Sequence, residues 1–341
     1  MNLTPANIII SRTDSIGDVV LTLPLAAVLK KHFPAAKIAF IGKSYTRPVI
    51  NACRYVDAFI DKEAFLREQV TVCGQEPDTI LHVLPDVAIA ARARQLGIPW
   101  RVGTTNRLFH WTTCNKLVPL GRRRSSLHEA QLNLRLLKAF GIDTHFTLEA
   151  IGQLFGLEKI KPLPAALEAL IAGDQYNLIL HPKSQGSARE WGIDNFIQLI
   201  RGLDKTRYRI FISGTEKERQ LVKPLFDAVG SHVIDIMGRM PLDEFISFIA
   251  HADGLVANST GPLHIAGALG KDAFGIYPPM RPIHPGRWAP LGPKAQVFVL
   301  NKSCSDCKNN AASCHCIMEV PPLLLKDALD KTTKKTMSTI E

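Results

Sequence analysis

The feature that most constrains this chain is a repeated alternation of short apolar runs with segments of helical periodicity. Asn7–Ser11 is a continuous β-branched run, typical of a buried parallel strand, and residues 17–31 then place apolar side chains at helical spacing. Further strands are expected at 37–41, 58–60, 79–83 and 100–102, and further helices at 47–53, 87–96 and 128–140. Such a series predicts an α/β fold whose parallel sheet is covered on both faces.

A second series of the same kind follows residues 152–172, a segment rich in Pro, Gly and Ala where we expect the linker. Its expected strands are 178–181, 209–214, 233–236, 255–258, 273–277 and 297–300. A chain of 341 residues suffices for two domains of roughly 150 residues each. We therefore expect doubly wound domains over 1–160 and 175–320, facing a central cleft at the carboxyl ends of their strands. The helix and tail over 321–341 are expected to pack back on the first domain.

The charge of the chain indicates an anionic partner. Lys and Arg total 41 against 31 Asp and Glu, a net charge of +10, and residues 1–170 hold 21 basic and 14 acidic side chains, a net +7. This balance suits a phosphorylated ligand, an acidic lipid surface or nucleic acid, and an unevenly charged surface is the alternative. No apolar run reaches the roughly 18 residues of a membrane span, and no secretory signal precedes the first strand. We expect a cytoplasmic protein with peripheral contact to the inner face of the membrane.

The first expected strand runs into S-R-T-D-S-I-G-D, residues 11–18, at the start of a helix. Gly17 permits close backbone approach, and the unpaired N–H groups of a helix N-terminus can hold an anion. The dinucleotide fingerprint G-x-G-x-x-G is absent. Asp14 and Asp18, beside Arg12 at the tip of a strand, suit a general base, and helix capping by one of these acids is the alternative.

A second motif, H-P-K-S-Q-G-S-A-R-E-W, follows the first strand of the second series at residues 181–191. It combines small and hydroxyl side chains with Lys183 and Arg189. Backbone N–H groups, hydroxyls and cations together suit a diphosphate. For Lys183 a solvated basic loop is the alternative.

A third motif, N-S-T-G-P-L-H-I-A-G-A-L-G, spans residues 258–270. It places Ser259, Thr260 and the Gly261 amide at the start of a helix, where a phosphate can bind. His264 follows one turn into this helix as a further candidate. A packed core histidine is its alternative.

The order and separation of these motifs make the whole chain resemble glycosyltransferase family 9, the family of ADP-heptose:lipopolysaccharide heptosyltransferases. The resemblance implies a GT-B fold of two Rossmann-like domains, with the acceptor on the first and the nucleotide sugar mostly on the second. It also implies an inverting, metal-independent transfer of a heptose or related sugar to a lipopolysaccharide core or related surface glycan. The sequence contains no D-x-D element that would hold Mg²⁺.

The resemblance also implies roles for individual residues. Asp18 is the catalytic base, supported on the acceptor side by Arg12, Asp14 and Gly17. Arg189 replaces a family lysine that contacts the donor phosphates, which keeps the cation but changes its shape. The other implied donor-binding residues are Ser184, Gln185, Thr215, Glu216, Met240, Ser259, Thr260, Gly261 and His264. Ser259 stands where some heptosyltransferases carry Asp, which leaves the donor sugar open.

A cysteine cluster, C-S-D-C-K-N-N-A-A-S-C-H-C, follows the second series. Its thiolates could bind a structural zinc ion tetrahedrally, and a disulfide pair and free thiols are the alternatives; the cysteines are Cys304, Cys307, Cys314 and Cys316. No cofactor is expected for catalysis itself.

Other functions stay open from the residues alone. A GT-B transferase with another nucleotide-sugar donor would keep the fold and the base, and a catalytically inactive homologue that binds glycan is a second alternative. A dinucleotide oxidoreductase and a nucleic-acid-binding protein lack their sequence signatures here. We expect a nucleotide sugar and a lipid-linked or oligosaccharide acceptor as partners. Arg122, Arg123 and Arg124 suit acceptor phosphates or an anionic leaflet, with an exposed loop as the alternative.

Overall fold

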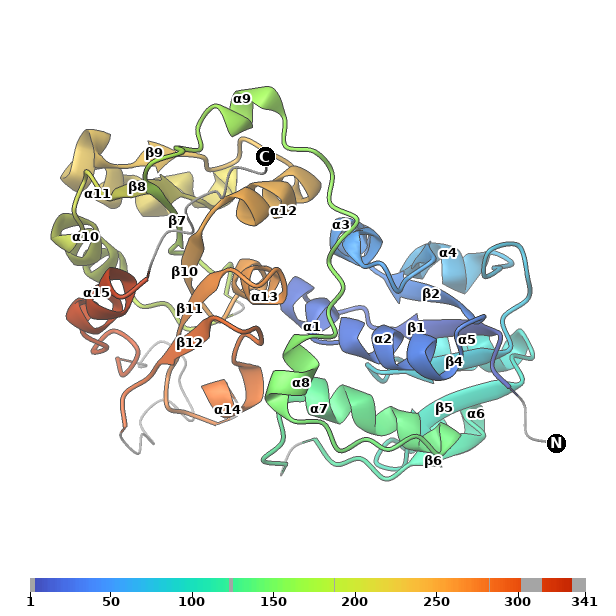
Figure 1. Ribbon diagram of the computed structural model, residues 1–341. Helices are drawn as coiled ribbons and strands as arrows, with labels where there is room; N and C mark the ends of the chain where they lie inside the picture. The colour runs from blue at the N-terminus through green and yellow to red at the C-terminus, as the bar shows by residue number, and fades with distance from the viewer. Residues whose placement is uncertain (1–3, 123–124, 187, 282, 302–314, 333–341) are drawn as a thin grey trace. The chain divides into compact units, whose positions relative to one another are not determined.

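The computed structural model describes residues 4–122, 125–186, 188–281, 283–301 and 315–332. The chain forms two compact units that divide between Ile160 and Lys161, and each unit has its own sheet (Figure 1). Within the described ranges each sheet has six strands, and neighbouring strands run parallel. The fold is therefore α/β with two Rossmann-like sheets, as the alternation of apolar runs and helical segments predicted.

The sheet of unit 1 has the strand order β3–β2–β1–β4–β5–β6. Its strands are β1 (Asn7–Ser11), β2 (Lys37–Gly42), β3 (Ala58–Asp61), β4 (Thr79–His82), β5 (Trp100–Thr104) and β6 (Lys116–Val118). β1 pairs with β2 on one side and with β4 on the other, so the order reverses direction between β1 and β4. Ligands of open parallel sheets bind outside the carboxyl ends of strands at such a switch point.

Several elements of unit 1 differ from the predicted ones, and the short helices at Lys62–Arg67, His110–Thr113 and Leu148–Gly152 were not predicted. β6 was not predicted, because its three residues include a single buried side chain. The helix predicted at 17–31 is two helices, α1 (Ile16–Val20) and α2 (Leu23–His32), because Pro24 has no N–H to continue the first. The helix predicted at 128–140 is α7 (Glu129–Leu134) followed by a 3₁₀ turn.

Helices cover the sheet of unit 1 and complete its core. Phe65 and Ile89 pack in one cluster with Ile9, Ile41 and Ile80 of three strands. Each buried side chain of this kind stabilises the fold by about 1.5–3 kcal/mol relative to exposure. The helices besides α1, α2 and α7 are α3 (Arg47–Ala52), α4 (Lys62–Arg67), α5 (Val87–Gln95), α6 (His110–Thr113) and α8 (Leu148–Gly152).

The sheet of unit 2 repeats this topology in the order β12–β11–β10–β7–β8–β9. Its strands are β7 (Tyr176–His181), β8 (Tyr208–Ile212), β9 (Ile234–Asp235), β10 (Gly254–Asn258), β11 (Asp272–Ile276) and β12 (Ala295–Phe298). The switch point lies between β7 and β10, which pair directly. Its helices are α9 (Ala165–Glu168), α10 (Ile193–Gly202), α11 (Arg219–Val229), α12 (Leu242–His251), α13 (Gly261–Ala268), α14 (Pro285–Trp288) and α15 (Pro322–Asp330).

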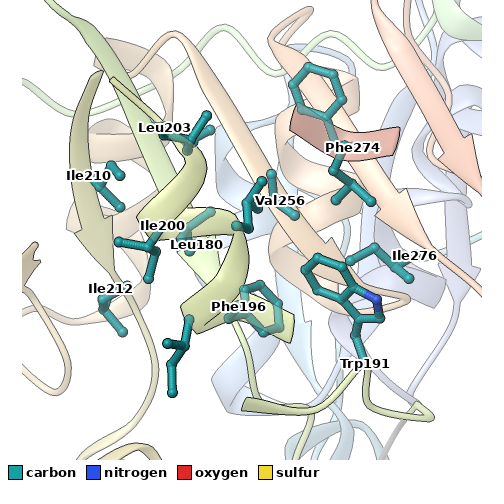
Figure 2. Close-up of a cluster of buried hydrophobic side chains, with 14 of the residues drawn as sticks. Leu180, Trp191, Phe196, Ile200, Leu203, Ile210, Ile212, Val256, Phe274 and Ile276 are labelled. Atoms are coloured by element: carbon teal, nitrogen blue, oxygen red, sulfur yellow. The ribbon is translucent and has the colours of Figure 1, made fainter. Parts of the chain in front are cut away.

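One cluster of buried side chains joins α10 to the sheet of unit 2 (Figure 2). Trp191 is fully buried, and its ring meets Phe196 edge-on with centroids 5.0 Å apart. The indole N–H of Trp191 donates to the Val320 carbonyl at 2.8 Å, so this large side chain is buried without losing its hydrogen bond. The core therefore anchors the loop that ends at Trp191, which carries the second motif.

The last described helix, α15, packs on its own unit. Leu325 and Leu329 are fully buried in the unit 2 cluster, and Arg207 donates to the Asp330 carbonyl at 2.9 Å. Its buried apolar side chains are used against α10. The expectation that this helix and the tail pack back on the first domain stays a prediction. Within the described ranges, no helix has the length and apolar character that a bilayer-spanning segment needs.

Candidate active site

The carboxyl end of β1 leads to a buried arginine that gathers acidic side chains. The side chain of Arg12 is only 4% exposed. Its Nε donates to Asp14 Oδ1 at 2.7 Å, its Nη2 donates to Asp18 Oδ1, and its Nη1 donates to Glu129 Oε1 at 3.0 Å. The guanidinium offsets the repulsion among the three carboxylates. It thereby holds both predicted acids, Asp14 and Asp18, at the switch point of unit 1.

Asp18 lies in the first turn of α1, directly after the buried Gly17. Arg12 holds one carboxylate oxygen, and the exposed hydroxyl of Ser15 donates to the other, Oδ2. Ser15 is the N-cap residue of α1, so the alternative that Asp14 or Asp18 caps this helix is wrong. A ligand hydroxyl that replaced Ser15 at Oδ2 would meet an oriented carboxylate, which is what a general base requires.

Buried polar groups of α7 support Arg12 from behind. Glu129 is 2% exposed and accepts from both Arg12 and Arg122. Asn133, one turn later, accepts from Arg122 at 3.1 Å and donates to the Leu21 carbonyl at 3.1 Å. The exposed-loop alternative is therefore wrong for Arg122, while Arg123 and Arg124 lie outside the described residues. Sequence reasoning missed Glu129 and Asn133, because Glu129 lies 117 residues from Arg12 and no local motif marks it.

Burial and charge shift the pKa values in this cluster. Burial raises the pKa of Asp14 from 3.8 to about 6, since the attraction of Arg12 only partly offsets the loss of water and Asp18 adds repulsion. Burial lowers the pKa of Arg12, but Asp18, Asp14 and Glu129 outweigh it and raise that pKa overall. The guanidinium therefore stays charged, while Asp14 changes its charge near pH 6.

In unit 2, Glu190 organises the loop that follows β7. Lys183 pairs with Glu190, and the N–H and the hydroxyl of Ser184 each donate to Glu190 Oε1 at 3.1 Å. The Lys183 side chain is 17% exposed, so the alternative of a solvated basic loop is wrong. Arg189 differs, because its Nε is buried without a hydrogen-bond partner in the part of the chain that the structure describes. Of the two predicted cations, Arg189 is thus the better placed to meet a ligand.

Asn258, at the end of β10, bridges both ends of the β7 loop. Its Oδ1 accepts from the Trp191 N–H at 2.9 Å, and its Nδ2 donates to the Pro182 carbonyl at 3.0 Å. Because β7 and β10 are neighbours, this fully buried side chain connects the two loops of the switch point. Sequence reasoning assigned Asn258 no role, since its partners lie 67 and 76 residues away.

The start of α13 carries the third motif. Thr260 is the N-cap residue and is 5% exposed, and its Oγ1 has no hydrogen-bond partner among the described residues. Gly261 begins the helix, whose first N–H groups have no intrahelical acceptor. A buried, unpaired hydroxyl beside the positive end of a helix dipole favours an anionic ligand oxygen. Ser259 lies half-buried before Thr260, and His264 is buried one turn into the helix.

The ends of β8 and β9 form a corner that contains the residues expected to meet the nucleoside. The N–H and hydroxyl of Thr215 donate to Glu218 Oε2 at 2.9 and 2.8 Å, and Gln185 Nε2 donates to Thr215 Oγ1 at 3.3 Å. Gly238, with φ of +65°, packs so closely that an added Cβ would lie 2.7 Å from Glu216 Oε2. The structure thus brings Gln185, Thr215 and Glu216 together, and Met240 follows half-buried just before α12.

The predicted zinc site is not supported. Within the described ranges, no group of three or more His, Cys, Asp or Glu side chains is placed to hold a metal ion. Cys304, Cys307 and Cys314 lie outside those ranges, and Cys316 is buried. The four-cysteine arrangement therefore stays a prediction from the sequence.

Comparison with known proteins decides the family. The model of glycosyltransferase family 9 (heptosyltransferase) matches residues 90–318, more than half of the chain. The chain belongs to glycosyltransferase family 9. This family 9 protein is 26% identical over 310 residues to a proposed glycosyltransferase of Haemophilus influenzae. The aligned region covers 83% of this chain and 86% of that protein. It is 21% identical over 281 residues to lipopolysaccharide heptosyltransferase 3 of Escherichia coli K12, with coverage of 76% and 79%.

A solved structure shows the same fold. That of E. coli ADP-heptose lipopolysaccharide heptosyltransferase II matches with a TM-score of 0.71 at 18% identity, over 95% of this chain and 97% of that one. The resemblance drawn from the three motifs is confirmed, and with it the GT-B fold class and the assignment as a glycosyltransferase enzyme. The roles of individual residues in this family 9 protein stay predictions.

Proposed function

We propose that this glycosyltransferase moves a heptose from ADP-heptose to a lipopolysaccharide core or related surface glycan, with inversion at the anomeric carbon and without a catalytic metal. The names of two similar proteins, lipopolysaccharide heptosyltransferase 3 and ADP-heptose lipopolysaccharide heptosyltransferase II, support this sugar and this acceptor class. The observation that carries the donor assignment is the buried, unpaired hydroxyl of Thr260 at the start of α13.

In the proposed reaction, Asp18 is the base. The acceptor hydroxyl donates to Asp18 Oδ2 in place of Ser15, while Arg12 keeps Oδ1 and orients the carboxylate. The acceptor oxygen bonds to the anomeric carbon as the bond from that carbon to the diphosphate oxygen breaks, and the acceptor proton passes to Asp18. Attack opposite the leaving group inverts the configuration.

The leaving nucleoside diphosphate gains negative charge during this step. Arg189 supplies a cation, the Gly261 N–H and the Thr260 hydroxyl supply hydrogen bonds, and α13 supplies the positive end of its dipole. Because the charge develops as the bond breaks, these groups stabilise the transition state more than the bound donor. In other glycosyl transfers a divalent ion can stabilise the leaving diphosphate. Here side chains, backbone N–H groups and the helix dipole fill that role, so the transfer requires no metal ion.

Thr260→Val tests the donor site directly. Valine keeps the shape of threonine but cannot bond a phosphate oxygen, so calorimetry should show about tenfold weaker ADP binding. Thr144→Val, which removes a buried hydroxyl of unit 1, should bind ADP like the unchanged protein. Equal ADP affinity in the two variants would refute the donor assignment.

A transfer assay tests the reaction. With ADP-heptose and deacylated lipopolysaccharide core, mass spectrometry should detect the heptosylated product, and NMR should show the inverted anomer. ADP binding without any turnover would instead indicate an inactive GT-B homologue that binds glycan.

A different nucleotide sugar is the second candidate donor. Ser259 favours it, because a neutral hydroxyl stands where some heptosyltransferases carry a carboxylate, and a hydroxyl offers the sugar a donor as well as an acceptor. Parallel assays with ADP-heptose and UDP-glucose separate the two, since the correct donor should show the higher kcat/KM.

A further inference from the structure

A long segment of unit 1 contains no acidic side chain. Residues 87–128 hold no Asp or Glu, although the whole chain has 31 of them. The segment includes α5, β5, α6 and β6. Its cations are Arg92, Arg94, Arg101, Arg107, Lys116, Arg122, Arg123 and Arg124. A continuous stretch with this balance creates a strongly positive local potential.

The tertiary structure holds these cations with neutral partners. Arg94 donates to the Thr112 carbonyl at 2.9 Å, and the Lys116 ammonium lies 4.5 Å from the centre of the Trp100 ring. Arg107 is exposed. Among the described residues of the segment, Arg122 is the one cation with an ion pair. Lys116 lies on the face of the sheet away from α6, because its register partner Val102 points opposite to Gly103, which faces α6. The charge beside α5 and α6 that no ion pair neutralises among the described residues is therefore that of Arg94 and Arg107.

The most exposed large apolar side chains described in unit 1 lie in the same segment. Leu108 is 88% exposed, Trp111 61% and Val87 60%. The Trp111 N–H donates to the Thr105 carbonyl at 2.9 Å, so the indole is held in place while its ring stays accessible. Val87 opens α5, Trp111 lies in α6, and these two helices contact each other. Apolar side chains exposed among cations are costly in water but suit the interfacial region of a membrane.

We propose that this face, formed by Val87, Arg94, Arg107, Leu108 and Trp111, docks on an anionic lipid bilayer. The inference rests on the proposed function, in that a lipid-linked acceptor is met at a membrane, yet the docking itself needs neither donor nor acceptor. Arg94 and Arg107 meet headgroup phosphates, and Trp111 with Leu108 enters the headgroup layer. A nucleic acid would match the charge but would leave the aliphatic Leu108 without an apolar environment.

Vesicle sedimentation tests the proposal with the full chain. Vesicles of equal parts phosphatidylglycerol and phosphatidylcholine should bind the protein, and raised salt should release it. The variant Arg94→Gln, Arg107→Gln should partition about 25-fold more weakly, since each basic residue near an anionic surface contributes a factor of about five. The exposed pair Leu108→Ser, Trp111→Ser should also weaken binding, and it removes little native packing.

Matched variants in unit 2 serve as controls. Arg201 and Lys205 are exposed cations, and Leu221 is 58% exposed. Changing both cations to Gln, or Leu221 to Ser, should leave vesicle binding unchanged.

Three results would overturn the docking face. The protein could bind pure phosphatidylcholine vesicles as well as the anionic ones, or the unit 2 controls could lose as much vesicle binding as the unit 1 variants. It could also bind an RNA oligonucleotide more tightly than the vesicles, with that RNA binding abolished by the variant that removes the unit 1 cations. Transfer to a soluble deacylated acceptor is measured separately. Transfer without vesicle binding would refute the docking face alone, and vesicle binding without transfer would refute the proposed function alone.

Discussion

Replacing Arg12 with Gln should destabilise unit 1 strongly, because Arg12 is the cation that three carboxylates share. Arg12 is 4% exposed, and the side chains of Asp14, Asp18 and Glu129 are 30%, 15% and 2% exposed. Glutamine is shorter and neutral, so it leaves three acids facing one another with little water. Removing one partner of a buried ion pair costs about 3–5 kcal/mol. For a unit of this size, that loss corresponds to a fall in Tm of about 10 °C.

The loss should grow with pH. Without the guanidinium, the pKa of Asp14 in the folded state should rise further above its unfolded value, because the attraction of Arg12 that opposes the effect of burial is lost. A carboxyl with a raised folded pKa contributes stability at low pH and loses it as pH rises through that pKa. In the unchanged protein Asp14 already behaves in this way, with its pKa raised to about 6. The difference in Tm between Arg12→Gln and the unchanged protein should therefore be small at about pH 4 and complete at about pH 8.

Calorimetric unfolding across this pH range measures the effect, and Arg54→Gln is the matched control. Arg54 also pairs with a carboxylate, Glu158, but the two side chains are 50% and 57% exposed. An exposed pair is worth about 0–1 kcal/mol, so this control should hardly change Tm. If Arg12→Gln lost no more stability than Arg54→Gln, or lost the same amount at every pH, the account of a shared buried cation would be wrong.

Three further predictions concern the reaction. Asp18→Asn should lower turnover by about 100-fold or more while calorimetry shows unchanged ADP affinity, and unchanged turnover would remove Asp18 as the base. Arg189→Ala should weaken ADP binding by about tenfold, with Arg189→Lys intermediate; three equal affinities would refute the diphosphate contact. EDTA should leave transfer rates unchanged, and activity restored only by added Mg²⁺ would contradict a metal-free step.

The candidate site was predictable where its residues stand in short motifs at strand ends. Asp18, Thr260 and Arg189 each follow a strand in a recognisable local pattern, and the structure places each beside a switch point of its own sheet. Their supporting residues were not predictable in this way. Glu129 and Asn258 contribute buried hydrogen bonds to chain segments far away in sequence, and nothing in their own neighbourhoods distinguishes them from ordinary polar positions.

The sequence alone determined the two βα series, because β-branched apolar runs and helical spacing express backbone preferences and burial over a few residues. It could not determine which distant side chains meet. Arg122 turned inward to Glu129, and the apolar face of α15 was buried against α10 of its own unit. Such pairings depend on how elements approach in three dimensions, since a buried charge or apolar face is stabilised by whatever lies opposite it and not by its neighbours in the chain.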